Sequence, residues 1–284
     1  MTDLLRIGLP KGRMERAVLE LLADSGVQVT PGARGYRPHV QLDRVEAKVL
    51  KPQNIVEMLM LGSRDVGFAG ADWVRELSAD VVEVLDTRLD PVDIVAAAPG
   101  KIATDQLQRR LVVASEYEQL ARNWISIRRL DATFVRSYGA TEVFPPEDAD
   151  IVIDCTATGA TLRANGLAVI DTLLSSSTRL YASPAAWAEP GKRCRIEDLA
   201  LLLSSVLEAR QRVMLEVNAS AEVLARVVAV LPAMRQPTVS PLFGNGSYAV
   251  KAAVPRNRLP QIIPAVRAAG GTDVVVSSLS QIVP

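Results

Sequence analysis

The stretch DIVIDCTATGATLRANGL, residues 150–167, joins a strand to a loop rich in threonine and glycine. The β-branched run 151–153 is typical of a buried strand, and Asp154 follows it directly. Three threonine hydroxyls and Gly159 come within the next seven residues. Hydroxyl groups and the backbone N–H groups of a loop that enters a helix suit a phosphate, and a carboxylate at a strand end suits ribose hydroxyls or Mg²⁺. The stretch therefore predicts a sugar-phosphate site. A helix start without a ligand is the alternative interpretation.

Strand and helix patterns alternate on both sides of this stretch, which predicts an α/β fold with two lobes. The first series occupies residues 1–90, and a second series follows Pro91 and extends to residue 174. Strand-like runs lie at residues 4–9, 45–50, 66–69, 81–85, 94–98, 111–114, 133–138 and 151–153, and helical runs lie at 14–22, 55–60 and 117–130. Two α/β lobes side by side predict a cleft between them.

The last part of the chain, residues 211–284, has a different pattern. Its strand and helix signals follow the order βαββαβ, which is that of a ferredoxin-like domain. Strand signals lie at residues 212–217, 237–242, 247–254 and 273–277, and helix signals lie at 223–228 and 259–266. We therefore expect a separate small domain. A purely structural domain that mediates oligomerisation is the alternative to a ligand-binding one.

The composition indicates a soluble globular protein that does not bind nucleic acid. The 284 residues are 49% hydrophobic and 23% charged, and 32 lysines and arginines balance 32 aspartates and glutamates, which leaves no general basic surface. Two cysteines, Cys155 and Cys194, are too few for a disulfide scaffold and fit a reducing cytoplasm. The first residues lack the pattern of a signal peptide, and the longest apolar run, residues 199–207, is too short to span a membrane. We expect a cytoplasmic protein.

Five motifs occur in order along the chain. They are LRIGLPKGRM at residues 5–14, DVGFAGADWV at 65–74, YGATEV at 138–143, TGATLRANGL at 158–167 and QPTVSPL at 236–242. Their order and spacing resemble the ATP phosphoribosyltransferase family, the first enzymes of histidine biosynthesis, over essentially the whole chain. The resemblance implies a long-form enzyme with two catalytic lobes similar to periplasmic binding proteins. It also implies that residues 175–210 return to the first lobe and that residues 211–284 form a regulatory domain.

The resemblance implies that N1 of the adenine ring of ATP is joined to C1 of phosphoribosyl pyrophosphate, with release of pyrophosphate. A neutral ring nitrogen attacks and pyrophosphate leaves readily, so the site must mainly align two polyanions and stabilise charge. Thr161 is expected to cap the helix after the loop, and Asp154 to meet a Mg²⁺ ion that is largely substrate-borne. The residues implied to bind phosphoribosyl pyrophosphate are Asp154, Thr156, Ala157, Thr158, Gly159, Ala160, Thr161 and Leu162.

Residues of the first lobe are implied, by the same resemblance, to bind ATP. Lys11, Glu142 and Asp154 are the expected catalytic residues. The simpler interpretations are a solvated helix start for residues 11–13, an N-cap for Asp72 and a first-turn helix glutamate for Glu142. Lys51 stands where the family usually has arginine, which leaves open a transferase with a different aromatic acceptor. The expected ATP-binding residues are Lys11, Gly12, Arg13, Lys51, Gly70 and Asp72.

The polar residues of the small domain that match the family are implied to bind histidine as an inhibitor. They are Glu216, Asn218, Thr238 and Ser240. Feedback would act through a homo-oligomer, a dimer or a hexamer, in which histidine favours the assembly that it binds better. The main alternative is a two-lobed sensing protein that has lost catalysis. The loop at 154–161 argues against that alternative, because a solute-binding cleft needs no ribose-phosphate cradle.

Overall fold

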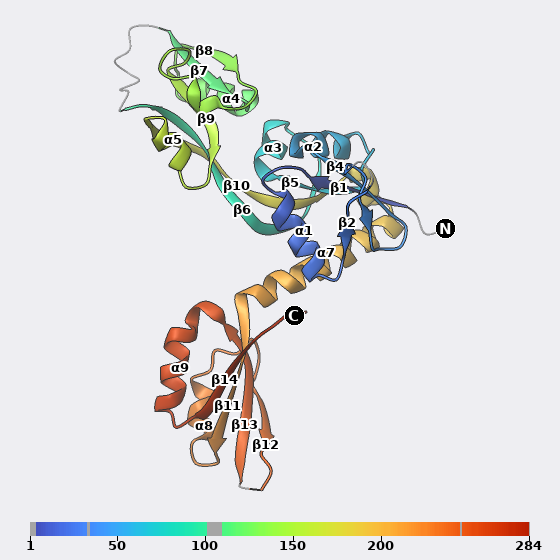
Figure 1. Cartoon of the computed structure of the whole chain (residues 1–284), viewed down its shortest axis with the longest axis vertical. Helices are drawn as coiled ribbons and strands as arrows, with labels where there is room; N and C mark the ends of the chain where they lie inside the picture. The colour runs from blue at the N-terminus through green and yellow to red at the C-terminus, as the bar shows by residue number, and fades with distance from the viewer. Residues whose placement is uncertain (1–3, 33–34, 101–109, 245, 284) are drawn as a thin grey trace. The chain divides into compact units, whose positions relative to one another are not determined.

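The computed structural model describes residues 4–32, 35–100, 110–244 and 246–283 (Figure 1). The chain divides into two compact units. The first unit contains the chain up to residue 200 except residues 24–26, and the second contains residues 24–26 and 201–284. Each helix within the described ranges is too short or too polar to cross a lipid bilayer.

The first unit is built on one mixed sheet, whose eight described strands follow the order β4-β1-β5-β10-β6-β9-β7-β8. Parallel strands β1, β4 and β5 form one end of this sheet, which we call lobe I, and parallel strands β7, β8 and β9 form the other end, lobe II. The strands are β1 (Leu5–Pro10), β4 (Val45–Leu50), β5 (Val66–Gly70), β6 (Val82–Pro99), β7 (Leu111–Ser115), β8 (Ala132–Arg136), β9 (Ile151–Thr156) and β10 (Leu167–Ala182).

Helices connect the strands of each lobe, as the alternating pattern predicts. Lobe I carries α1 (Glu15–Asp24), α2 (Pro52–Met60), α3 (Ala71–Glu76), α6 (Pro184–Ala188) and the start of α7 (Pro190–Gln211), with a small hairpin of β2 (Val29–Thr30) and β3 (His39–Val40). Lobe II carries α4 (Glu118–Ile127), α5 (Ala160–Ala164) and the 3₁₀ helix η2 (Thr141–Val143). The predicted helix at 117–130 is therefore confirmed, with shorter ends.

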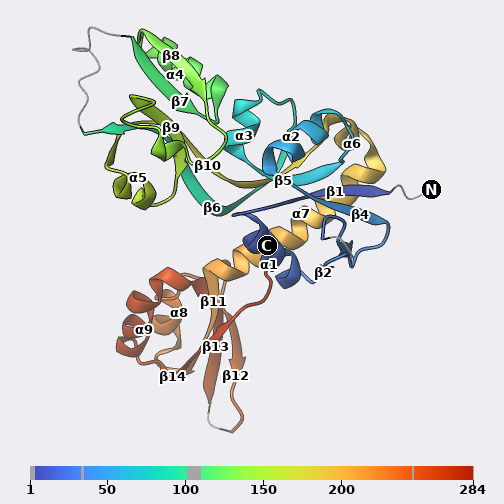
Figure 2. The same cartoon turned by 45° about the horizontal axis from the view of Figure 1, so that its top comes forward.

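Two long strands, β6 and β10, pass through both lobes and pair antiparallel along their length (Figures 1 and 2). The sequence predicted separate strands at 81–85 and 94–98 with a new series after Pro91, and this prediction was wrong because Pro91 lies inside β6. Pro91 cannot donate a hydrogen bond to the neighbouring strand. The strand accommodates it through register shifts in the pairing and through left-handed φ values of 56° at Arg88 and 47° at Asp90. The predicted lobe limits, 90 and 174, fall inside these two strands.

Strand β9 is buried on both faces, and this burial fixes where its polar end emerges. Ile151 and Ile153 pack in one cluster, which includes Trp124, and Val152 packs in a second cluster with Leu162. The predicted buried strand at 151–153 is confirmed. Asp154 is the first residue of β9 that is not fully buried, so its carboxylate lies where the hydrophobic core of lobe II ends.

The second unit is an antiparallel sheet of order β12-β13-β11-β14 with two helices, which confirms the ferredoxin-like βαββαβ prediction. Alternate residues of its first strand, from Val213 to Ala219, are buried in one cluster with Val227, Ile262 and Val266 of the helices. The intervening residues lie on the opposite face of the sheet. The elements are β11 (Arg212–Ser220), α8 (Leu224–Ala229), β12 (Thr238–Pro241), β13 (Ser247–Pro255), η3 (Arg256–Arg258), α9 (Leu259–Ala268) and β14 (Thr272–Ser278).

Candidate active site

A cavity of about 580 Å³ lies between lobe I and lobe II at the carboxyl ends of β1, β5, β7 and β9. In α/β sheets this edge is where ligands usually bind. Every residue expected to bind phosphoribosyl pyrophosphate lines this cavity, together with Lys11, Arg13, Lys51, Asp72 and Glu142 from the other expected sets. The lining residues are Lys11, Arg13, Met14, Lys51, Pro52, Gln53, Asp72, Trp73, Glu116, Tyr117, Glu142 and the run from Asp154 to Leu162.

The loop between β9 and α5 satisfies its own backbone through threonine hydroxyls. The N–H of Gly159 donates to Thr156 Oγ1 at 2.9 Å, and the N–H of Ala160 donates to Thr158 Oγ1 at 3.4 Å. Gly159 is the N-cap residue, with a left-handed φ of 71° that favours glycine. The prediction that Thr161 caps the helix was wrong, because Thr161 lies inside α5. Its exposed side chain lines the cavity instead.

Asp154 is the most strongly perturbed acid of the cavity. Burial raises its pKa to about 6, and the nearby carboxylates Glu142 and Glu116 add to the rise, while the N–H of Cys155 donates to Asp154 Oδ1 at 2.7 Å and opposes it. The charges of these two carboxylates disfavour the ionised form of Asp154. A cation, or a ligand that brings one, would relieve this repulsion.

Three cations line the lobe I side of the cavity. Lys11, Arg13 and Lys51 are exposed, and no ion pair joins any of them to a carboxylate within the described residues. The ammonium of Lys11 lies 5.3 Å from the centre of the Tyr36 ring. Gly12 does not itself line the cavity, but its φ of 88° requires glycine in the turn that carries Lys11 and Arg13. These cations leave their charge available to an anionic ligand.

Asp72 is buried and belongs to a hydrogen-bonded cluster between the two lobes. Its carboxylate accepts from Tyr117 Oη and from Ser176 Oγ, both at 2.7 Å. The alternative prediction of an Asp72 N-cap was wrong, because Gly70 is the N-cap residue of α3. A Cβ on Gly70 would lie 2.0 Å from Asp72 Oδ1, so Gly70 is required by this close approach and does not line the cavity.

The sequence did not single out Glu116 and Tyr117 as cavity residues. Tyr117 stacks on Trp73 with 4.8 Å between ring centres, and burial together with the Asp72 carboxylate raises the pKa of its hydroxyl. Both residues directly follow β7, at the same sheet edge as Asp154. Their position after a strand was therefore the available signal.

The four residues expected to bind histidine lie on one face of the second unit's sheet. Across neighbouring strands, Thr238 pairs with Lys251 and Lys251 with Glu216, while Ser240 and Asn218 both pair with Ala249. Directly paired residues share a face of the sheet. Lys251 Nζ lies 3.0 Å from Glu216 Oε2 on this face, which is opposite the helices.

The fold and the cavity together define a class of protein: a two-lobed α/β protein whose cavity is lined by a threonine-rich loop of lobe II and by exposed cations of lobe I. The comparisons with known proteins give the family. A family model described as ATP phosphoribosyltransferase matches residues 51–205, and one described as HisG, C-terminal domain, matches residues 209–281. This chain belongs to the ATP phosphoribosyltransferase family.

Individual relatives support this assignment. An ATP phosphoribosyltransferase of Chlorobium phaeobacteroides is 34% identical, over 100% of this chain and 99% of the relative. One of Pelotomaculum thermopropionicum is 35% identical, over 99% of each chain. The solved ATP phosphoribosyl transferase (HisG:HisZ) complex from Thermotoga maritima superimposes with a TM-score of 0.63 and 20% identity, covering 71% of this chain and 99% of that one, which confirms the fold over the part that is covered.

Proposed function

We propose that this phosphoribosyltransferase joins N1 of ATP to C1 of phosphoribosyl pyrophosphate and releases pyrophosphate, as the first step of histidine biosynthesis. The main structural support for this proposal is the lining of the cavity. A single cavity brings the whole Asp154 to Leu162 loop of lobe II opposite Lys11, Arg13 and Lys51 of lobe I. One substrate with a ribose and phosphates, and a second with a triphosphate, need these two kinds of surface.

The residues of lobe II hold phosphoribosyl pyrophosphate in this proposal. Thr158 and Thr161 offer hydroxyls to the 5-phosphate, Gly159 and Ala160 keep the backbone close, and Leu162 anchors the loop in the core. Asp154 faces the ribose. Adenine N1 is itself the nucleophile and attacks C1 with its lone pair as the bond from C1 to pyrophosphate breaks, so no side chain has to act as a nucleophile or deprotonate N1. The site accelerates the reaction by alignment and by stabilising charge on the departing pyrophosphate.

The residues of lobe I hold ATP and the departing pyrophosphate. Lys11 and Arg13, on the turn after β1, and Lys51, before α2, place positive charge where the phosphate groups of both substrates meet. Glu142 lies on the acidic side, near Asp154. Asp72 acts indirectly, because its carboxylate is already bound by Tyr117 and Ser176.

The family uses a metal ion in catalysis, and we propose that this ion is Mg²⁺. Within the described ranges, no group of three or more His, Cys, Asp and Glu side chains could hold a metal by itself. Asp154, with Glu116 and Glu142 near it, supplies the oxygen donors that Mg²⁺ prefers. These residues fit an ion whose other ligands are substrate oxygens, and the ion would neutralise charge on the pyrophosphate.

Histidine, in this proposal, inhibits the enzyme through the sheet face that carries Glu216, Asn218, Thr238 and Ser240, in a cytoplasmic homo-oligomer. The double variant Glu216→Ala, Thr238→Ala is expected to lose inhibition and keep its turnover, because the carboxylate and hydroxyl that accept from histidine are gone. The measurement is turnover against histidine concentration, with the wild type beside it. Full inhibition of the double variant would contradict the residue assignment.

The decisive assay follows formation of phosphoribosyl-ATP in the near ultraviolet, from ATP, phosphoribosyl pyrophosphate and Mg²⁺, with pyrophosphatase present. We expect product, and less of it when histidine is added. Product that does not respond to histidine would leave the catalytic proposal in place and remove the regulatory one. Binding of both substrates without product would overturn the proposed reaction and favour another acceptor or a sensing protein.

A further inference from the structure

Glu76, the last residue of α3, links the two lobes through a pair of hydrogen bonds. Glu76 does not line the candidate active site. Its side chain is only 8% exposed. One carboxylate oxygen accepts the N–H of Gln119 at 2.9 Å, and the other accepts the N–H of Leu120 at 3.0 Å. Because α3 belongs to lobe I and α4 to lobe II, this carboxylate spans the two lobes.

The two N–H groups belong to the first turn of α4, where a helix has no acceptors of its own. In most helices the N-cap side chain accepts one of them. The N-cap residue here is Tyr117, which makes no such hydrogen bond. Glu76 supplies the missing cap from the other lobe, and its negative charge lies at the positive end of the helix dipole.

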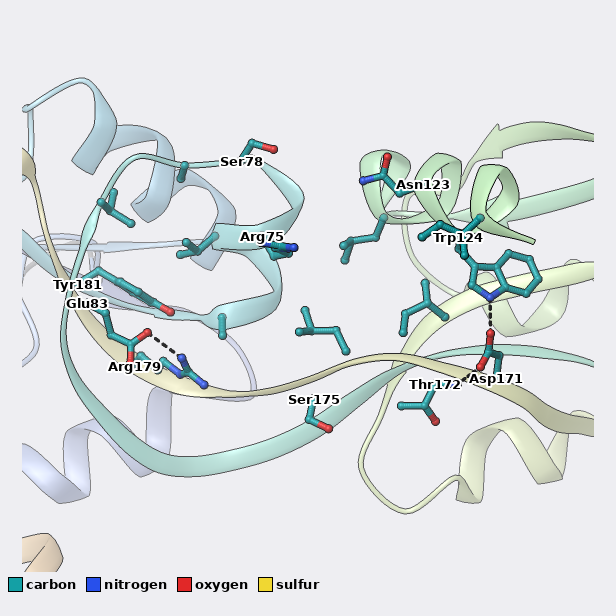
Figure 3. Close-up of a pocket in the computed structure, with 18 of the residues that line it drawn as sticks. Arg75, Ser78, Glu83, Asn123, Trp124, Asp171, Thr172, Ser175, Arg179 and Tyr181 are labelled. Atoms are coloured by element: carbon teal, nitrogen blue, oxygen red, sulfur yellow. Dashed lines mark hydrogen bonds and ion pairs between the residues drawn. The ribbon is translucent and has the colours of Figure 1, made fainter. Parts of the chain in front are cut away.

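The bond lies between two cavities. On one side is the candidate active site, lined by Asp72 and Trp73 of α3 and by Glu116 and Tyr117 before α4. On the other side is a cavity of about 1180 Å³, lined by residues such as Ser78 of lobe I and Asn123 of α4 (Figure 3). Figure 3 shows these two residues on opposite sides of the opening. Nearer the active site, Trp73 of α3 packs against the hydrophobic cluster of lobe II, so Glu76 acts beside an apolar contact between the lobes.

Among the residues that the structure describes, the chain passes between the lobes through β6 and β10, whose pairing contains several register shifts. Such irregularities in a two-stranded connection leave room for it to bend. If the lobes separate, Glu76 loses two charge-assisted hydrogen bonds and the start of α4 loses its acceptor. The bond therefore favours the arrangement in which the loop of lobe II faces the cations of lobe I.

We propose that Glu76 is a positioning residue that holds the lobes closed and so keeps the two substrate surfaces at their working separation. This proposal rests on the proposed function, because it takes the cavity between the lobes as the substrate site. A substrate that contacts both lobes binds to the closed arrangement, so its apparent affinity falls in proportion to the closed fraction. Loss of the bond should therefore raise KM and leave kcat at saturation nearly unchanged.

Glu76→Gln is the test variant, because it keeps the shape of the side chain and removes the charge and one acceptor. Glu118→Gln is the matched control: Glu118 lies at the same end of α4, but its ion pairs with Arg122 and Arg136 stay within lobe II. We expect Glu76→Gln to raise KM for both substrates about tenfold with kcat within about twofold, and Glu118→Gln to leave both constants unchanged.

A second measurement does not depend on turnover. Hydrogen exchange at the amides of Gln119 and Leu120 should be about tenfold faster in Glu76→Gln than in the wild type. Phosphoribosyl pyrophosphate with Mg²⁺ should slow it in the wild type. Unchanged exchange in Glu76→Gln would overturn the proposal even if the wild type formed no product. A lower Tm with unchanged KM would also overturn it, because Glu76 would then only stabilise the fold.

Discussion

The loop between β9 and α5 and the turn between β1 and α1 line the same cavity, but their polar groups differ in state. In the loop, the hydroxyls of Thr156 and Thr158 already bind backbone N–H groups of the same loop. In the turn, Lys11 and Arg13 are exposed, and no ion pair of the described chain engages them. Lobe II thus offers a surface whose threonine hydroxyls are held in place by N–H groups of the same loop, and lobe I offers cations that are not paired with a carboxylate of the described chain.

From this difference we expect the two lobes to contribute differently to substrate binding. A preformed surface costs little to occupy, so it should determine where the sugar phosphate binds. Free cations attract any polyanion, so they should contribute affinity and rate more than selectivity. Changes in the loop should therefore have larger and more specific effects than changes in the cations.

Asp154→Asn should give the largest loss of activity. We propose that this carboxylate faces the ribose and the metal-bound substrate, so its removal is expected to lower kcat/KM by about 100-fold or more, as loss of a main electrostatic contact does. Steady-state assays at saturating Mg²⁺ measure the effect. A loss of less than tenfold would show that the acidic side of the cavity is not central to the reaction.

Asp154→Asn should also stabilise the fold, and the gain in stability should depend on pH. Because the pKa of Asp154 is raised to about 6 by burial, the folded protein holds a proton that the unfolded chain releases near its ordinary value of 3.8. The ionised form therefore costs stability increasingly as pH rises between about 4 and 6. Asp154→Asn should show a higher Tm than the wild type above pH 6 and no advantage below pH 4. An advantage that is equal at all pH values would exclude this cause.

Thr161→Val should give the next largest effect. It removes an exposed hydroxyl that we propose binds the 5-phosphate, and it keeps the shape of the side chain. KM for phosphoribosyl pyrophosphate should therefore rise by about 10- to 100-fold, as for loss of a hydrogen bond to a charged group. KM for ATP and binding of histidine should change little. Thr172→Val, at an exposed position of β10, is the control. An equal rise in KM for both substrates would show that the loop does not discriminate between them.

The sequence predicted the loop better than its surroundings, and the reason is the range of the interactions. The buried run 151–153 and the change to polar residues at Asp154 are local signals, so both were found. The Asp72 cluster joins residues 45 and 104 positions apart, which no local pattern reveals. Thr161 was misplaced by two residues because glycine, in a left-handed conformation, begins α5 without a side-chain cap. Pro91 suggested an interruption, but the irregular pairing of β6 with β10 tolerates it.

Lys51→Ala should have a smaller effect than either loop substitution, since Lys51 is exposed and solvent screens its charge. We expect KM for ATP to rise about tenfold, which corresponds to about 1.4 kcal/mol, and the difference from wild type to shrink as salt is added. Lys48→Ala, in β4 and outside the cavity lining, is the control. A salt-independent effect would indicate a contact other than charge attraction.

Arg64→Met should have the smallest effect on activity. It tests how much a buried cation without a carboxylate partner lowers the stability of the fold. Arg64 is only 6% exposed, its Nη1 has no hydrogen-bond partner, and burial lowers its pKa. An unsatisfied buried donor costs about 1–3 kcal/mol, so replacement by an apolar side chain should raise Tm by several degrees and leave turnover unchanged. Arg6→Met should instead lower Tm. Arg6 Nη2 lies 3.0 Å from Oδ1 of buried Asp65, so the substitution removes one of the cations that pair with this carboxylate. If Arg64→Met lowered Tm, the attraction of Arg64 to Glu46 and Asp65 would stabilise the fold by more than the burial of its charge destabilises it. Cations without a direct carboxylate partner would then be tolerated inside this fold as well as in its cavity.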